Sequence, residues 1–319
     1  MEKIKVGIIG AGNRANFQTK SIIDSGIGEV IVVYSPFKEE VKIFSEKYGI
    51  KYTTFLEEIL ENPQISTVTI STPNATHYEI SKRALLNNKN VLVEYPPTLK
   101  IEEMDELINI AREKNLVYWV SLTQLLENPF YTIKKNIEKI GRPLFAFYSY
   151  ISPFLSGWYS DSKLCGPLYI WQHYHFVTQL LDIFNDIEEV CAFENIEYDN
   201  EGKMRLTSSI MNLKFSSGFI STIEFAMGIR NLRDFRVKFV GEEGIFYFEK
   251  GELYFEKKDK GKKRVEMEEK ARSIDTFNFL EKIKEGESDI STAIKAKRIL
   301  KICLMAEISA KEKKVVKIE

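Results

Sequence analysis

The sequence predicts an α/β protein with two domains: an N-terminal Rossmann domain, which is a doubly wound parallel sheet, and a C-terminal α+β domain with a large, mostly antiparallel open sheet. A glycine-rich turn near the start, strand–helix alternation over the first 120 residues, and hairpin-linked strands after residue 206 support this prediction. At 319 residues the chain is long enough for two cores. We expect domains at 1–121 and 122–319, with the last helix a candidate to pack back on the first domain, and a working site in the cleft between them.

The first element is an apolar strand at residues 4–9, which runs directly into the turn 10–15, a G-x-G-x-x-A pattern. Gly10 allows the tight turn, Gly12 leaves room for a pyrophosphate to approach the backbone, and Ala15 allows close packing of helix and strand. The phosphate would lie on free N–H groups at a helix N-terminus. The candidate cofactor-binding residues here are Gly10, Gly12, Asn13 and Arg14.

Further strands and helices alternate up to residue 120. Strands are expected at 30–34, 67–71, 90–94 and 117–120, and helices at 38–48, 74–87 and 101–114. Units of this length predict a parallel sheet with right-handed crossovers.

After residue 121 the pattern changes. We expect helices at 128–140 and 168–184, the second begun by Gly166-Pro167, and a strand at 144–150. Strands joined by short turns follow at 210–215, 219–225, 236–240, 245–249 and 253–257, and helices close the chain at 276–285 and 290–308. The short turns predict a largely antiparallel sheet.

The composition narrows the class of partner. The chain has 45 basic and 46 acidic residues, so nothing indicates binding to nucleic acid or to an anionic membrane. No apolar run is long enough to span a bilayer, and the first residues lack a signal-peptide pattern. Three cysteines are scattered without metal-ligand spacing, so we expect buried thiols, no metal and a cytoplasmic protein.

Two motifs in the first domain carry a resemblance to a known family. Residues 70–77, ISTPNATH, and 90–98, NVLVEYPPT, resemble the signature of the glucose–fructose oxidoreductase / inositol dehydrogenase / MocA family. Residues 239–244 and Ser309-Ala310 extend the resemblance over essentially the whole chain. It implies NAD(P)-dependent hydride transfer on a small-molecule substrate such as a sugar or polyol. It also implies an open-faced sheet used for oligomer contacts, hence a homodimer or homotetramer.

Two family positions differ in this chain. The usual Glu-Lys-Pro is Glu94-Tyr95-Pro96, a triplet that biliverdin reductases carry, and the usual Asp four residues before His175 is Trp171. Hydride transfer requires a group that donates a proton or stabilises charge. Tyrosine can serve, because a nearby cation lowers its pKa of about 10. Tyr95 and His175 are therefore the catalytic candidates, although His175 could instead be a structural histidine.

The end of the second predicted strand bears on cofactor preference. An acid about 20 residues after the glycine motif binds the ribose of NAD, whereas this position is Ser35, with Lys38 close behind. A hydroxyl and a cation suit the 2′-phosphate of NADP, so NADP(H) is favoured over NAD(H). Alternatively, Ser35 only starts a turn, and Glu39 or Glu40 binds the ribose.

The resemblance implies further cofactor contacts after the 67–71 strand, from Thr72, Pro73, Asn74 and His77, although Asn74 could also cap the next helix. Glu94 is expected to contact the nicotinamide side of the cofactor or to orient Tyr95.

Aromatic residues crowd the start of the second domain, with Trp158 and Trp171 as candidate substrate-binding residues. The group comprises Trp119, Phe145, Phe147, Tyr148, Tyr150, Phe154, Trp158, Tyr159, Tyr169, Trp171 and Tyr174. A planar or apolar substrate fits this composition better than a free hexose, although most of these rings could simply form core. The chain is thus predicted to be an oxidoreductase acting on a carbonyl, hydroxyl or imine; the alternative is a catalytically silent NAD(P)-binding sensor.

Overall fold

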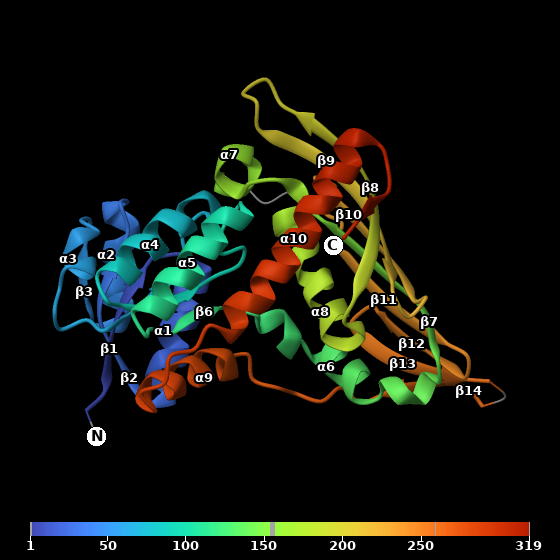
Figure 1. The fold of residues 1–319 in the computed structure, drawn as a ribbon, viewed down its shortest axis with the longest axis horizontal. Helices are drawn as coiled ribbons and strands as arrows, with labels where there is room; N and C mark the ends of the chain where they lie inside the picture. The colour runs from blue at the N-terminus through green and yellow to red at the C-terminus, as the bar shows by residue number, and fades with distance from the viewer. Residues whose placement is uncertain (1, 154–156, 259, 319) are drawn as a thin grey trace. The chain divides into compact units, whose positions relative to one another are not determined.

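Runs of β-branched residues near the N-terminus form the strands of a parallel sheet, and later runs form a second sheet (Figure 1). The computed structural model describes residues 2–153, 157–258 and 260–318. They divide into two compact units, Met1–Thr123 with Ala271–Arg298, and Gln124–Lys270 with Ile299–Glu319. The predicted division into domains 1–121 and 122–319 stays a prediction.

The first unit is built on a six-stranded, all-parallel sheet in the order β3-β2-β1-β4-β5-β6. Its strands are β1 (Ile4–Ile9), β2 (Gly28–Tyr34), β3 (Lys51–Thr53), β4 (Thr67–Ile70), β5 (Asn90–Val93) and β6 (Tyr118–Val120). The strand order reverses between β1 and β4, and open α/β sheets bind ligands beyond the carboxyl ends of the strands at such a point.

Helices connect these strands. They are α1 (Asn13–Ser25), α2 (Lys38–Tyr48), α3 (Glu57–Leu60), α4 (His77–Leu86) after the short 3₁₀ turn η1 (Asn74–Thr76), and α5 (Ile101–Glu113). A late segment, α9 (Ser273–Lys284), lies beside α1 (Figure 1). Its Phe279 and Leu280 pack in the same core as Val6 and Ile8 of β1, so the end of the chain completes the hydrophobic core of the first unit.

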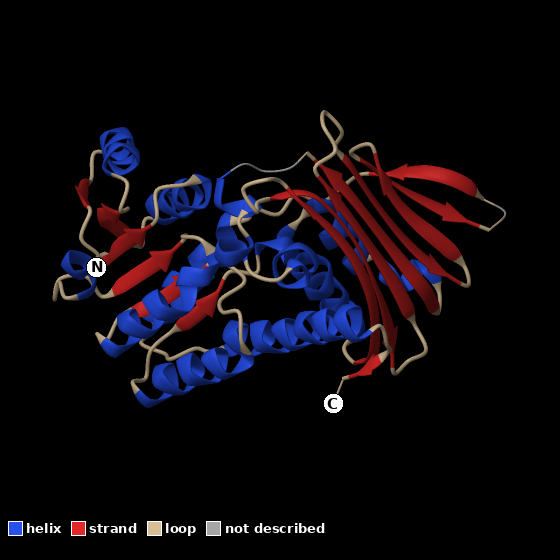
Figure 2. Ribbon diagram, turned by 90° about the horizontal axis from the view of Figure 1, so that it is seen from above, coloured by secondary structure: helices blue, strands red, loops and turns tan. Residues whose placement is uncertain are grey.

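The second unit is built on a nine-stranded sheet (Figure 2) in the order β14-β13-β12-β11-β7-β10-β9-β8-β15. The strands are β7 (Pro143–Ser152), β8 (Ile187–Tyr198), β9 (Met204–Phe215), β10 (Ile220–Met227), β11 (Asp234–Gly241), β12 (Gly244–Glu249), β13 (Glu252–Lys257), β14 (Gly261–Val265) and β15 (Val316–Lys317). Its described pairs are antiparallel except β7 with β10. Side chains alternate between buried and accessible along β9 and β10, as a sheet with one covered face requires.

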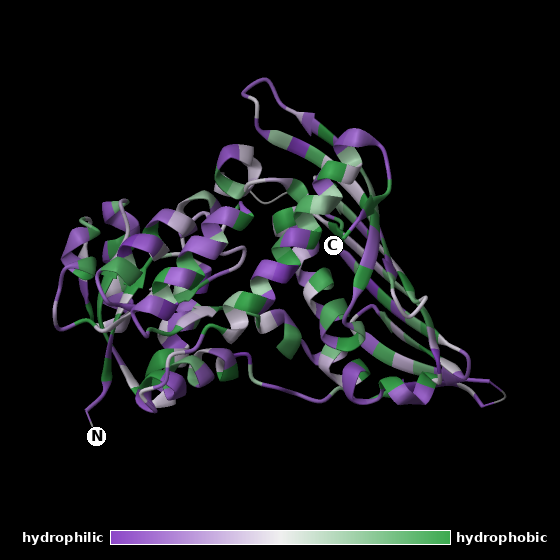
Figure 3. Cartoon of the chain, in the orientation of Figure 1, coloured by the Kyte–Doolittle hydropathy of each residue, from purple (hydrophilic) through white to green (hydrophobic). Residues whose placement is uncertain are grey.

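The helical segments of the second unit are mostly short. They are η2 (Thr123–Leu126), which starts at the unit boundary, α6 (Asn128–Lys135), η3 (Ile137–Ile140), η4 (Gly157–Ser160), α7 (Ser162–Cys165), the π-helical turn η5 (Tyr169–His173) and α8 (Tyr174–Phe184). Helix α10 (Ser291–Glu312) starts among residues of the first unit and ends among those of the second. Figure 3 shows α8 largely in green, which fits a helix whose residues are mostly buried.

The predicted fold class is confirmed, but several elements differ from the prediction. The strands β3, β8, β14 and β15 were not predicted. The helix expected at 128–140 is interrupted at Asn136, and the helix expected at 168–184 starts as a π-helical turn. Within the described residues, no helix has the length and apolar character needed to cross a bilayer.

Candidate functional site

The glycine turn after β1 is fixed by the backbone at Gly10. This residue has φ of +112°, and a Cβ built on it would lie 2.5 Å from the carbonyl oxygen of Ser71. Its N–H donates to the carbonyl of Tyr34 at 2.8 Å. Gly10 therefore connects the ends of β2 and β4, and its lack of a side chain is required by the protein itself.

Gly12 is different, because no described residue lies close enough to require a glycine there. It precedes the first turn of α1 with an ordinary φ of −82°, and a Cβ built on it would meet no atom within 4 Å. The first turn of α1 carries no acidic residue. An open space without an acidic side chain at the N-terminus of a 13-residue helix fits a phosphate group. The residues present at this turn, including the exposed Asn13, thus fit a dinucleotide.

Arg14 and Glu94, predicted separately as cofactor residues, form one ion pair that is partly exposed at Arg14 and buried at Glu94. Nη2 of Arg14 donates to both Glu94 carboxylate oxygens at 2.9 Å and to Oγ1 of Thr123 at 3.3 Å. Gln18 of α1 donates a third bond to the Glu94 carboxylate at 2.7 Å. Since only 4% of Glu94 is exposed, these bonds offset the cost of burying its charge. The pair joins the glycine turn to the end of β5.

A second buried carboxylate, Asp275 of α9, belongs to the same unit and was not predicted. One of its oxygens accepts a bond from the indole N–H of Trp119 at 3.0 Å. Burial raises the pKa of Asp275 to about 6. Its neighbour Thr276 donates to Gln18 at 2.6 Å. Local sequence patterns carry no signal for this contact, because Thr276 lies 258 positions from Gln18 along the chain.

His77 is also buried, at the start of α4. Its Nδ1 lies 2.8 Å from the carbonyl oxygen of Pro96 and its Nε2 lies 2.8 Å from that of Thr72. The buried Asn74 and partly exposed Pro73 precede it in the loop after β4. The structure therefore brings together the two loops that the sequence assigns to the cofactor, but His77 uses both ring nitrogens within the protein.

Tyr95 lies between Glu94 and Pro96, immediately after β5, and is partly exposed. The peptide bond between Tyr95 and Pro96 is cis. Both neighbours of Tyr95 are buried. This position is at the carboxyl edge of the parallel sheet, where a ligand of the first unit is expected.

The residues that bear on cofactor preference follow β2. The Oγ of Ser35 accepts a bond from the backbone N–H of Phe37 at 3.3 Å, so Ser35 does start a turn. The same hydroxyl can also donate its hydrogen, but Ser35 is buried, with 3% of its surface exposed. Lys38 is exposed in the first turn of α2, together with Glu39 and Glu40.

In the second unit, three aromatic rings form a continuous group. Trp158 stacks on Tyr159 with ring centroids 3.7 Å apart, and Tyr159 contacts Trp171 at 6.0 Å. Trp171 is 8% exposed, and among the described residues its indole N–H has no acceptor. His175 follows one turn later and is partly exposed. Phe154 lies outside the described residues.

Other aromatic residues of the predicted group form core. The rings of Tyr148, Tyr169 and Tyr174 are fully buried. His173 is also buried; its Nε2 contacts Oγ of Ser209 at 2.7 Å, and burial lowers its pKa to about 3. A histidine that stays neutral above pH 3 cannot exchange a proton near neutrality.

No group of three or more His, Cys, Asp or Glu side chains among the described residues is arranged to hold a metal ion.

Comparison with known proteins identifies the first unit. Residues 4–122 match a family model described as an oxidoreductase family with an NAD-binding Rossmann fold. Residues 4–122 are therefore similar to the GFO/IDH/MocA family over the segment that this model matches. This matched region contains the glycine turn, the two loops joined by His77 and the Glu94–Tyr95–Pro96 segment.

Individual curated proteins match parts of the chain. The scyllo-inositol 2-dehydrogenase (NAD(+)) of Bacillus subtilis is 26% identical over 45% of this chain and 43% of its own length. The scyllo-inositol 2-dehydrogenase (NADP(+)) of the same organism is 28% identical over 60% of this chain and 55% of its own length. The chain thus spans about half the length of these curated relatives.

A solved structure shows the same fold over almost the whole chain. Biliverdin reductase from Synechocystis sp. PCC 6803, in complex with biliverdin and NADP+, has a TM-score of 0.87 at 20% identity. The similarity covers 95% of this chain and 98% of that chain. The two chains therefore share the same two-sheet fold.

Proposed function

We propose that the protein is an NAD(P)-dependent oxidoreductase that transfers a hydride between nicotinamide and a small carbonyl, hydroxyl or imine substrate. The observation that carries this proposal is Gly12, whose open surroundings at the N-terminus of α1 have no role in the fold and suit a phosphate. The family match of residues 4–122 supports it. Gly10, Gly12, Asn13 and the loop from Thr72 to Asn74 would hold the cofactor.

Tyr95 is the proton donor that the first unit offers. A bound nicotinamide supplies or accepts the hydride, and the substrate atom beside the reacting carbon then needs a proton. The Tyr95 hydroxyl can donate one, and its backbone is held by the buried neighbours Glu94 and Pro96. His175 of the second unit is the other candidate, because it is partly exposed whereas His173 is not.

For the cofactor we propose NADP(H) over NAD(H). Support comes from Ser35, whose hydroxyl can donate to a 2′-phosphate, and from the exposed cation of Lys38. Glu39 and Glu40 in the same turn favour NAD(H). The two dehydrogenases from Bacillus subtilis divide between the two cofactors by name, so they do not decide this question.

For the substrate we propose a planar or apolar molecule rather than a free hexose. Support comes from the stack of Trp158 on Tyr159 and from the buried indole N–H of Trp171, which has no acceptor among the described residues. An aromatic face with one hydrogen-bond donor recognises a flat molecule that carries an acceptor oxygen or nitrogen.

The test begins with fluorescence titration of the purified protein with NADPH and NADH. Oxidation of the tighter-binding cofactor is then measured against sugars, aldehydes, imines and bilins. We expect Tyr95→Phe or His175→Ala to lower kcat by about 10²–10⁴-fold with little change in cofactor Kd. Tyr198→Phe, at an exposed tyrosine of β8, is the control for loss of a hydroxyl.

Two results would contradict this proposal. Failure to bind either nucleotide would exclude a dinucleotide site. Tight nucleotide binding without turnover on any substrate would favour the NAD(P)-binding sensor. This alternative is suggested by two positions where the family usually has Lys and Asp and this chain has Tyr95 and Trp171.

A further inference from the structure

His77 connects two loops of the first unit through a single side chain. The carbonyl of Thr72 lies in the loop after β4, and that of Pro96 lies in the loop after β5; these two strands are neighbours in the sheet. Both contacts measure 2.8 Å, and the His77 side chain is nearly inaccessible, at 1% exposure. His77 therefore has no surface left with which to touch a cofactor.

We propose that His77 is a positioning residue for Tyr95: it fixes the Glu94–Tyr95–Pro96 segment by tying the Pro96 carbonyl to the Thr72 carbonyl. This inference rests on the proposed function, in which Tyr95 donates a proton. It replaces the direct cofactor contact that the sequence suggests for His77.

The connection through His77 requires a hydrogen-bond donor, because its two partners are the carbonyl oxygens of Thr72 and Pro96. Both carbonyl oxygens only accept, so each contact is a hydrogen bond only where the ring nitrogen carries a hydrogen. Burial lowers the pKa of His77, and a neutral ring has one N–H. At any moment, therefore, His77 donates a hydrogen bond to one of the two carbonyls, while the other carbonyl faces the ring nitrogen that carries no hydrogen. A side chain with an amide N–H should restore part of this connection between the two loops.

The other side of Tyr95 is held independently. The Glu94 carboxylate receives bonds from Arg14 and Gln18 of α1. The backbone is thus anchored on both sides of Tyr95, whereas the Tyr95 side chain is partly exposed. Rigid support of this kind is what a proton donor requires, because a misplacement of about 1 Å can reduce a rate about 10²-fold.

The experiment compares His77→Phe, which fills the space without donors, with His77→Gln, which keeps an amide N–H. Ser81→Ala, at another buried position of α4, is the matched control. We expect His77→Phe to lower kcat by about 10–100-fold, with KM and NADPH Kd changed by less than about three-fold. His77→Gln should recover part of kcat, and Ser81→Ala should leave all three constants unchanged.

Hydrogen–deuterium exchange provides a readout that does not depend on turnover. The amides of Glu94, Tyr95 and Thr98 should exchange faster in His77→Phe, at an intermediate rate in His77→Gln, and at the wild-type rate in Ser81→Ala. If His77→Phe does not fold, the same comparison is made between His77→Gln and the wild type.

The outcomes separate this inference from the proposed function. Unchanged exchange at 94–98, or a loss of NADPH affinity as large as the loss of kcat, would refute the positioning role. If the wild type binds NADPH without turnover and His77→Phe still exchanges faster at residues 94–98, the positioning role of His77 is supported and the proposed oxidoreductase activity is refuted.

Discussion

Gly10 and Gly12 differ in what requires each glycine, although the motif treats them alike. Gly10→Ala places a Cβ 2.5 Å from the Ser71 carbonyl at a φ of +112°, so we expect a clear loss of stability. Gly12→Ala meets no protein atom, so we expect an unchanged melting temperature and about ten-fold weaker NADPH binding, or about 1.4 kcal/mol. Thermal unfolding and fluorescence titration of both variants check this.

The pair contains its own control, because the same substitution two residues apart should affect different measurements. Equal NADPH affinity of wild type and Gly12→Ala would mean that no ligand approaches this part of α1. An unchanged melting temperature in Gly10→Ala would mean that the turn can relax away from Ser71.

Asp275 makes stability depend on pH. Its pKa is raised by burial from 3.8 to about 6, so the folded protein binds the proton more tightly than the unfolded chain does. The stabilisation is therefore complete below pH 4 and is lost as the pH rises to about 6, at a cost of about 3 kcal/mol. Asp275→Asn keeps an acceptor for Trp119 and carries no charge.

We expect Asp275→Asn to unfold at a higher urea concentration than the wild type at pH 7.5 and at the same concentration near pH 4. Urea titrations across this range give both values. Thr276→Ala, at the next residue of α9, removes the bond to Gln18 and should not change the pH dependence. A constant difference between Asp275→Asn and wild type at every pH would contradict the raised pKa.

At the level of elements, the sequence predicted the strands and helices whose residue pattern is pronounced and missed those whose pattern is weak. The strands β1, β4 and β5 are short segments rich in apolar and β-branched residues, and their positions were predicted to within a residue or two. Strand β3 has only three residues, and β8 carries acids within its run, so neither stood out from its surroundings. Both obtain their regular structure from pairing with a neighbouring strand, β2 or β9.

The helix predicted over 168–184 shows the same limit. Its apolar composition predicted a helix, but not that Tyr169–His173 would form a π-helical turn. In that turn Gln172 contacts Thr207 and His173 contacts Ser209, both on β9. These contacts involve residues more than 30 positions away, so a local helical pattern could not reveal them.

The candidate site was predictable where one local motif forms it. The turn 10–15 and the loops after β4 and β5 were found from their residue types and their positions after strands. The bonds from Arg14 to Glu94 and from His77 to Pro96, and the carboxylate of Asp275, depend on tertiary packing. The sequence therefore indicated the turn and loops at this edge of the sheet, whose role in cofactor binding stays a prediction. It did not indicate that several of the residues expected to bind the cofactor bind one another.

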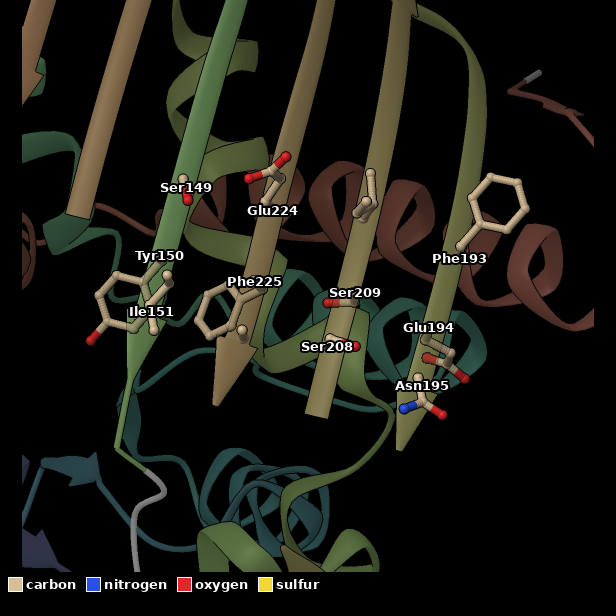
Figure 4. A pocket seen from close by; sticks show the side chains of 12 residues that line it. Ser149, Tyr150, Ile151, Phe193, Glu194, Asn195, Ser208, Ser209, Glu224 and Phe225 are labelled. Carbon is tan, nitrogen blue, oxygen red and sulfur yellow. The ribbon is translucent and has the colours of Figure 1, made fainter. Parts of the chain in front are cut away.

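At the scale of the whole molecule, the second sheet has an accessible face that the fold of one chain leaves uncovered. Phe193 of β8 lies directly opposite Ile210 of β9, and both are exposed, at 56% and 40%. Ile220 of β10, exposed at 53%, lies opposite Phe145 of β7. A hollow of about 380 Å³ lies among these strands (Figure 4). We propose that a second copy of this chain covers this face, as the family resemblance implies.

This proposal predicts that charge on the sheet separates the subunits. In Phe193→Glu/Ile220→Glu, two like charges would be buried without a partner in a dimer interface, which typically covers about 800 Å² on each subunit. We expect wild type to sediment as a dimer or tetramer at micromolar concentration and the double variant as a monomer with an unchanged far-UV spectrum. Leu232→Lys, at an exposed apolar residue of the turn before β11, is the control and should sediment as wild type does. A monomeric wild type would mean that no second copy covers this face. A double variant that remains associated would mean that the subunits meet elsewhere, because two unpaired charges cannot be buried at this face without a large loss of affinity.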